Sequence, residues 1–136
     1  MITVLFACVH NAGRSQMAAA FFAQLADPAQ ARAISAGTEP GAHVHPEVVA
    51  AMREAGIDLG QAVPTRLTEA LAASARILVT MGCGETCPVV PGVERIDWSI
   101  ADPKGQPPER VRQIRDDVRA RVDQLIAARG WRRAAR

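Results

Sequence analysis

The sequence predicts an α/β protein whose parallel sheet is covered by helices on both faces. Two observations lead to this fold class. Short apolar runs alternate along the chain with segments whose apolar residues recur at helical spacing, which is the pattern of βαβ units. The first run, Met1 to Cys8, is continuously apolar, as expected for a parallel strand buried on both faces. The 136 residues, 49% of them hydrophobic, suit one core, so we expect a single domain over residues 1–130.

The other elements follow in chain order. Arg14 to Leu25 is rich in Ala, Met and Phe, and a helix there should end before Asp27-Pro28. Proline at its start and Gly56 after its end predict a second helix over residues 46–55. Apolar residues at helical spacing predict a closing amphipathic helix from Glu109 to Ala128. The remaining expected elements are short: strands at 32–35, 76–81 and 93–96, and a helix at 68–75.

Charge and composition exclude several functional classes. The net charge is only +2 and most arginines are spread out, so nucleic acid is not an expected partner. The chain has no apolar run of 18 residues and no basic segment before its first apolar stretch, which argues against membrane insertion and secretion. We therefore expect a cytoplasmic monomer, with residues 131–136 forming a solvated basic tail. Three cysteines in such a chain favour thiol chemistry over permanent cross-links.

The first strand ends in a loop that suits a tetrahedral oxyanion. Cys8 and Arg14 are separated by five residues at a strand-to-helix turn, where backbone N–H groups and the helix N-terminus favour an anion and a thiolate. Arg14 offers a planar fork that matches two oxygens. Ser15 is placed to donate to the sulfur, and Asn11 or Gly13 to adopt the positive φ that a closed loop needs. The predicted anion-binding residues are Val9, His10, Asn11, Ala12, Gly13, Arg14 and Ser15.

The alternative is a purely structural role, in which Cys8 only ends a buried strand and Arg14 begins a solvated helix. Ligands favour the C-terminal ends of strands in α/β sheets, and the Asn, Gly and Ser positions are suitable, so we prefer the active-site interpretation. His43 and His45 form a pair without a third ligand nearby, which favours a solvated loop. We expect no metal and no bound cofactor.

The loop from Cys8 to Ser15, continuing as Gln16-Met17-Ala18, resembles the signature of arsenate reductases that share the low-molecular-weight tyrosine phosphatase fold. The resemblance implies a three-layer sandwich with a four-stranded parallel sheet in the order 2-1-3-4. It also implies that Asp102 is a general acid, although a loop aspartate rigidified by Pro103 or capping the next helix is the alternative. Further matching motifs span nearly the whole chain: Ser35-Ala36-Gly37, Val79-Thr80-Met81, Cys87-Pro88, Asp97-Trp98 and Asp102-Pro103.

The pair Cys83 and Cys87 favours a reductase over a phosphatase. Reducing arsenate to arsenite takes two electrons, which a second thiol can supply by attacking the adduct on Cys8. Cys83 follows the third strand, at the same sheet edge as the Cys8 loop, so we expect it to attack first and Cys87 to take over the disulfide. The short spacing leaves open that Cys87 attacks directly. A zinc or structural pair is the weaker alternative, because two further ligands are lacking nearby.

The chain has no tyrosine, and Lys104-Gly105 follows Asp102-Pro103 where phosphatases of this fold place aromatic residues. The predicted substrate is therefore arsenate, with phosphate or sulfate as analogues. The three thiols favour thioredoxin as the electron donor, and the alternative is a low-molecular-weight thiol with a glutaredoxin-like partner. Two other functions stay open: a phosphatase that hydrolyses phosphomonoesters through a phosphocysteine, and a non-catalytic module that binds oxyanions or senses redox state.

Overall fold

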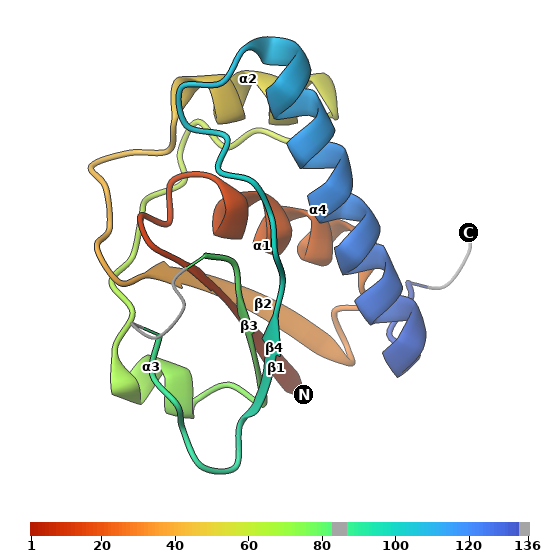
Figure 1. Ribbon diagram of the computed structural model, residues 1–136. Coiled ribbons are helices and arrows are strands. Elements are labelled where there is room, and N and C mark those ends of the chain that lie inside the picture. The colour runs from red at the N-terminus through yellow and green to blue at the C-terminus, as the bar shows by residue number, and fades with distance from the viewer. Residues whose placement is uncertain (83–86, 134–136) are drawn as a thin grey trace.

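The computed structural model describes residues 1–82 and 87–133 of the chain (Figure 1). Every predicted helix and strand is present, and no bound moves by more than two residues. No helix in the described part of the chain is both long and apolar enough to cross a membrane. The elements in order are β1 (Ile2–Cys8), α1 (Arg14–Leu25), β2 (Ala31–Gly37), α2 (Pro46–Glu54), α3 (Glu69–Ala73), β3 (Ile77–Thr80), β4 (Glu94–Asp97) and α4 (Pro108–Arg129).

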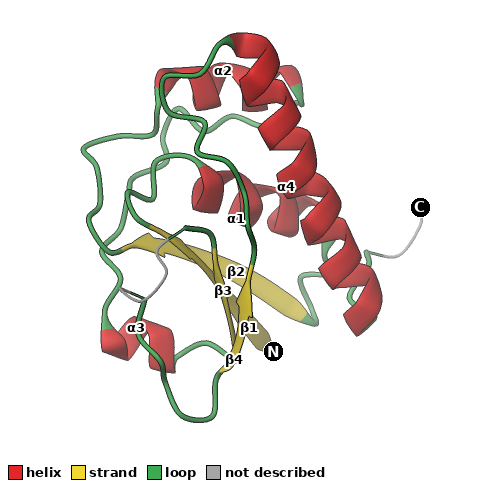
Figure 2. Ribbon diagram, viewed as in Figure 1, coloured by secondary structure: helices red, strands yellow, loops and turns green. Residues whose placement is uncertain are grey.

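The sheet is parallel and has the order β2-β1-β3-β4, which confirms the predicted topology. Figure 2 shows α1 and α4 together on one side of the sheet, while α3 lies on the other side. Because every strand pair is parallel, the C-terminal ends of the strands meet at one edge. Cys8 of β1 and Thr80 of β3 end there, only one residue apart in register, since Ala7 is the partner of Thr80.

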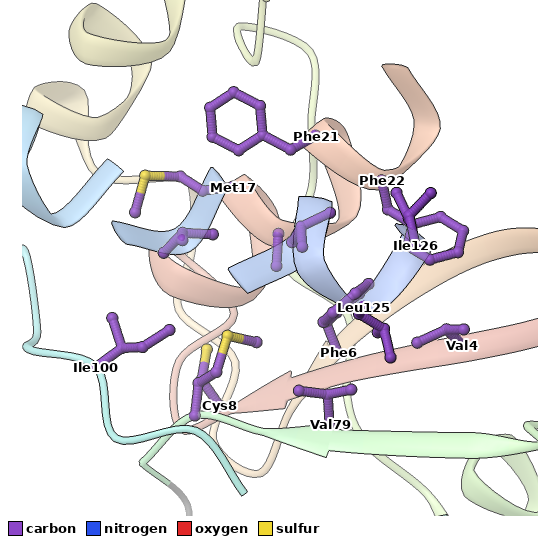
Figure 3. Close-up of a cluster of buried hydrophobic side chains, with 14 of the residues drawn as sticks. Val4, Phe6, Cys8, Met17, Phe21, Phe22, Val79, Ile100, Leu125 and Ile126 are labelled. Atoms are coloured by element: carbon purple, nitrogen blue, oxygen red, sulfur yellow. The ribbon is translucent and has the colours of Figure 1, made fainter. Parts of the chain in front are cut away.

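Alternate residues of β1 face two different hydrophobic clusters, because side chains along a strand point to opposite faces of a sheet. Phe6 and Cys8 belong to the larger cluster beneath α1 and α4, shown in Figure 3. Leu5 and Ala7 belong to a smaller cluster beneath α3. Both faces of β1 are thus covered, which explains why Thr3 is the only polar residue that its sequence places before Cys8. The helix residues predicted to be core are buried as expected: Met17, Phe21 and Phe22.

The start of the expected tail is packed against the domain, so the prediction of a solvated end at residue 131 was wrong. Trp131 is buried, and its ring lies edge-on to Phe22 with 6.1 Å between ring centroids. Its carbonyl oxygen accepts a hydrogen bond from the backbone N–H of Asp27 (2.7 Å). The physical reason is that the apolar area of one indole outweighs the solvation of the arginines that follow it. Residues 134–136 lie outside the described residues.

Candidate active site

The predicted anion loop joins β1 to α1 at the C-terminal edge of the sheet. Cys8 ends β1 and is 2% exposed, and Arg14 begins α1. Asn11 has a φ of 50°, in the left-handed region, as predicted for one of two candidates, whereas Gly13 has a φ of −145°. Asn11 tolerates this conformation better than most residues, since its short polar side chain bonds locally. The chain can therefore turn back above the sulfur.

The backbone carbonyl groups of this loop are turned away from its centre. The carbonyl oxygens of Cys8, Val9, His10 and Ala12 accept hydrogen bonds from the amides of residues 38, 39, 41 and 45, at 2.8–3.2 Å. In the described part of the chain, no backbone acceptor is found for the amides of residues 9–15. A loop whose carbonyls are held outward presents its N–H groups inward, and these join the free amides at the start of α1. This arrangement is suited to hold an anion, and we call residues 8–15 the anion cradle.

A chain of buried and partly buried hydrogen bonds ends at the sulfur of Cys8. Asn11 Oδ1 accepts from the backbone N–H of Thr65 (2.9 Å) and from Gln16 Nε2 (3.2 Å). Because a backbone N–H can only donate, the orientation of the Asn11 amide is fixed. Asn11 Nδ2 then donates to Ser15 Oγ (2.7 Å), which lies 2.8 Å from Cys8 Sγ. The Ser15 hydroxyl, already an acceptor, can donate its own hydrogen to a thiolate, as predicted.

The cradle also depends on a glycine at the end of β2. A Cβ atom at Gly37 would lie 2.6 Å from the carbonyl oxygen of Val9 and 2.8 Å from the backbone nitrogen of Asn11. Both atoms belong to the backbone, so no side-chain rotation could relieve the contact. In the sequence, Ser35-Ala36-Gly37 stands out only as part of the family resemblance. Its glycine permits the anion cradle to pack against the neighbouring strand.

Arg14 links the cradle to the segment that carries Asp102. Its side chain is 12% exposed. The guanidinium donates from Nη1 to the carbonyl oxygen of Ile100 (3.0 Å) and lies 3.9 Å from the carboxylate of Asp102. On its other side it touches Gly82, where a Cβ would lie 2.5 Å from Nη1. These contacts fix the direction of the fork. The structure thus brings together Arg14 and Asp102, which are 88 positions apart in sequence.

Asp102 stands in a loop that packs on the cradle. Its side chain is 50% exposed, and its Oδ1 accepts from the backbone N–H of Lys104 (3.0 Å). Pro103 is buried and lies so near Gly13 that a Cβ there would be 2.9 Å from the proline ring. A carboxyl group placed at the mouth of an oxyanion site, beside an arginine, is suited to deliver a proton to a departing oxygen.

His45 is only partly a residue of a solvated loop, which corrects the expectation for the His43 and His45 pair. His43 is exposed, but His45 packs next to Gly13. Burial lowers the pKa of His45 below its ordinary value of 6.5, while the charges of Glu47 and Asp102 oppose that shift. Among the described residues, no group of three or more His, Cys, Asp and Glu side chains is placed to hold a metal ion.

Of the two predicted resolving cysteines, the structure describes only Cys87. Cys83 lies outside the described residues. Cys87 is 2% exposed, is disulfide-bonded, and belongs to the smaller cluster beneath α3, whereas Cys8 is a free thiol in the larger one. Arg95 donates to the carbonyl oxygen of Cys87 (3.3 Å) and to Asp97 (3.0 Å). Hydrogen bonds from Thr80 and Arg95 lower the pKa of Asp97.

An open cleft of about 760 Å³ lies beside the cradle rather than above Cys8. It runs along the C-terminal ends of β3 and β4 and connects Gly82, which touches Arg14, with Cys87. The cleft therefore joins the edge of the cradle to one of the predicted resolving thiols. Its lining residues are Thr80, Gly82, Cys87, Val89, Arg95, Asp97, Trp98 and Ser99.

Sequence reasoning missed several residues that support the site. Gln16 and Thr65 fix Asn11, and the segment 38–45 holds the loop carbonyls. Gln16 directly follows Ser15 at the start of the helix. An amide side chain at that position could have been recognised from the sequence as a hydrogen-bonding partner of the loop. Thr65 acts through its backbone, which no side-chain pattern reveals.

Comparison with known proteins shows the family of this chain. The model of the low molecular weight phosphotyrosine protein phosphatase family matches residues 3–133. A candidate arsenate reductase of Halobacterium salinarum is 41% identical over 127 residues, covering 89% of this chain and 88% of the relative. The glutaredoxin arsenate reductase of Synechocystis is 35% identical over 130 residues, with coverages of 93% and 98%.

A solved structure, the thioredoxin-dependent arsenate reductase of Corynebacterium glutamicum, superimposes with a TM-score of 0.81 at 34% identity, covering 94% of this chain and 61% of that one. The family match covers almost the whole described domain, from β1 to the packed Trp131 segment, and so includes the cradle and the Asp102 loop. The resemblance seen in the motifs is therefore confirmed: the chain belongs to the low molecular weight phosphotyrosine protein phosphatase family.

Proposed function

We propose that this protein reduces arsenate to arsenite. The observation that carries the proposal is the cradle itself: a free Cys8 thiol lies at the base of a loop whose carbonyls are turned outward and whose arginine is fixed beside a carboxyl group. The relatives named as arsenate reductases support arsenate as the oxyanion. The absence of tyrosine also supports a small inorganic ion, since the chain lacks the phenol side chains that would line an aryl-binding cleft.

The first step is attack of the Cys8 thiolate on arsenic. An S–As bond forms and one As–OH bond breaks, with the departing oxygen leaving as water after it takes a proton from Asp102. Arg14 and the amides of residues 9–15 hold the remaining oxygens and balance their negative charge. Arsenic stays in its +5 state at this stage, so no electrons have yet been transferred.

The second step is the two-electron reduction. The Cys83 thiolate attacks the sulfur of Cys8, an S–S bond forms, and the electron pair of the S–As bond leaves with arsenic as arsenite. Cys87 then attacks Cys83 and releases Cys8 as a thiolate. Two observations support this order: Cys83 is joined to Gly82, which touches Arg14, and Cys87 belongs to the core cluster on the other face of the sheet from Cys8.

Thioredoxin is the proposed electron donor. A disulfide that has moved away from Cys8 leaves the anion cradle ready for a second arsenate, while a dithiol protein reduces the disulfide at the cleft beside β3 and β4. The thioredoxin-dependent relative supports this donor. The second candidate donor is a low-molecular-weight thiol with a glutaredoxin-like partner. It is supported by the glutaredoxin arsenate reductase that is 35% identical to this chain.

The decisive experiment measures arsenite release with purified thioredoxin, thioredoxin reductase and NADPH, in parallel with glutathione and glutaredoxin. We expect multiple turnover with thioredoxin. Cys83→Ser and Cys87→Ser should each stop turnover while Cys8 still reacts with an alkylating agent. Normal cycling by both variants would disprove the relay, and arsenite release only with glutathione would change the donor.

A phosphatase is the second candidate, favoured by the shared cradle and by the name of the matched family. Phosphate is a near-isostere of arsenate, and Asp102 could protonate a leaving alcohol equally well. Efficient hydrolysis of an aryl phosphate that persists in the Cys83→Ser, Cys87→Ser double variant would favour this function. If that hydrolysis is slow and arsenite release is fast, the protein is a reductase.

A further inference from the structure

We propose that Glu47 is a positioning residue that ties the Asp102 loop to α2 and so fixes the acid over the cradle. Glu47 lies in the first turn of α2, where a carboxylate is favoured by the helix dipole. Its Oε2 accepts a hydrogen bond from the backbone N–H of Gly105 (3.1 Å), 58 positions away. The proposal rests on the role proposed above for Asp102.

The amide that Glu47 holds belongs to a tight turn directly after the acid. The turn covers residues 103–106 and is closed by the N–H of Gln106, which donates to the carbonyl oxygen of Pro103 (3.1 Å). Gly105 is its third residue and has a φ of 71°, as turns with a left-handed third position require. This conformation leaves the N–H of Gly105 outside the turn, available to the carboxylate on α2.

The loop is held at two further points, and both lie on the cradle. Arg14 Nη1 binds the carbonyl oxygen of Ile100, and Pro103 packs on Gly13. The side chain of Asp102 itself is half exposed and stands 3.9 Å from Arg14, which is beyond hydrogen-bonding distance. Its position is therefore set by the backbone around it. Glu47 is the third anchor, and it holds the loop to α2.

Losing that anchor should slow proton transfer without weakening anion binding. A general acid must come within about 2.6–3.2 Å of the oxygen that it protonates. Misplacement by about 1 Å can reduce a rate by roughly 100-fold, and two anchors would remain, so we expect about a tenfold loss. Among the described residues, no hydrogen bond or ion pair joins Glu47 to residues 8–15, so the affinity for the ion should stay the same.

The test is a single-turnover measurement on the full-length reduced protein. The protein is mixed with arsenate, quenched with acid, and the loss of free thiols is followed by mass spectrometry. Glu47→Ala should lower this rate about tenfold, while Glu47→Gln should stay within about twofold of the wild type, because its amide oxygen still accepts from Gly105. Calorimetry with inorganic phosphate should give unchanged affinity for both. Glu109→Ala, which removes the same charge four residues after Gly105, is the matched control.

Asp102→Asn separates this inference from the function on which it rests. If Asp102→Asn is as fast as the wild type, the acid assignment fails and the positioning role fails with it. If Asp102→Asn is slow but Glu47→Ala is not, only the positioning role is overturned. Adding Glu47→Ala to Asp102→Asn should cause no further loss, whereas a full additional tenfold loss would show that Glu47 acts by another route. Urea denaturation of each variant verifies that the protein is folded.

Discussion

Substitution of Gly82 by alanine should weaken oxyanion binding through Arg14. The added Cβ would lie 2.5 Å from Arg14 Nη1, 3.0 Å from Cζ and 3.1 Å from Nη2, distances that require the guanidinium to move. Nη1 is the atom that binds the carbonyl oxygen of Ile100, so that bond is lost and the fork turns away from the cradle. A hydrogen bond to a charged group contributes about 1.5–3 kcal/mol. A guanidinium that has turned away can donate only one of its two hydrogen bonds to the ion. We therefore expect the affinity for phosphate to be roughly 10- to 100-fold lower.

A matched control separates this effect from backbone strain. Gly82 has a φ of 99° and Gly92 a φ of 83°, and a Cβ at Gly92 would have no neighbour within 4 Å. Alanine at either position should cost about 1–2 kcal/mol of stability, measured by urea denaturation. Only Gly82→Ala should weaken binding of inorganic phosphate, measured by calorimetry on the reduced protein. Equal phosphate affinities for the two variants would refute the idea that Gly82 makes room for the Arg14 fork.

Two predictions concern stability. Trp131→Ala should destabilise the domain by about 3 kcal/mol in urea, because it removes a buried indole from the cluster around Phe22, whereas the exposed Arg132→Ala should cost less than about 1 kcal/mol. For His45, burial lowers the pKa in the folded state below 6.5, so the unfolded chain binds more protons near that pH and His45 reduces stability as the pH falls through about 6.5. His45→Gln should therefore lose less stability than the wild type between pH 7.5 and pH 5.5, and a steeper loss in the variant would contradict this sign.

The sequence alone predicted the order of elements because the relevant signals are local. The largely apolar run of β1 can be recognised from its own residues alone, and so can the helical spacing of α4. Cys8, Arg14 and Ser15 lie within eight positions of each other, so the loop chemistry was also visible. Two residues departed from expectation. Trp131 did so because burial of an indole depends on a partner, Phe22, that is 109 positions away, and His45 did so because it packs next to Gly13.

The tertiary structure decided the contacts that orient the reactive side chains. Asn11 is fixed by the backbone of Thr65, the guanidinium of Arg14 is directed by Gly82 and Ile100, and the loop of Asp102 is held by Glu47. Each of these contacts joins segments brought together by the packing of separate elements, and several use backbone atoms that every residue type shares. The sequence determined which groups can react with an oxyanion. Only the folded chain determined where they point, because direction is a property of the packing and not of the residue.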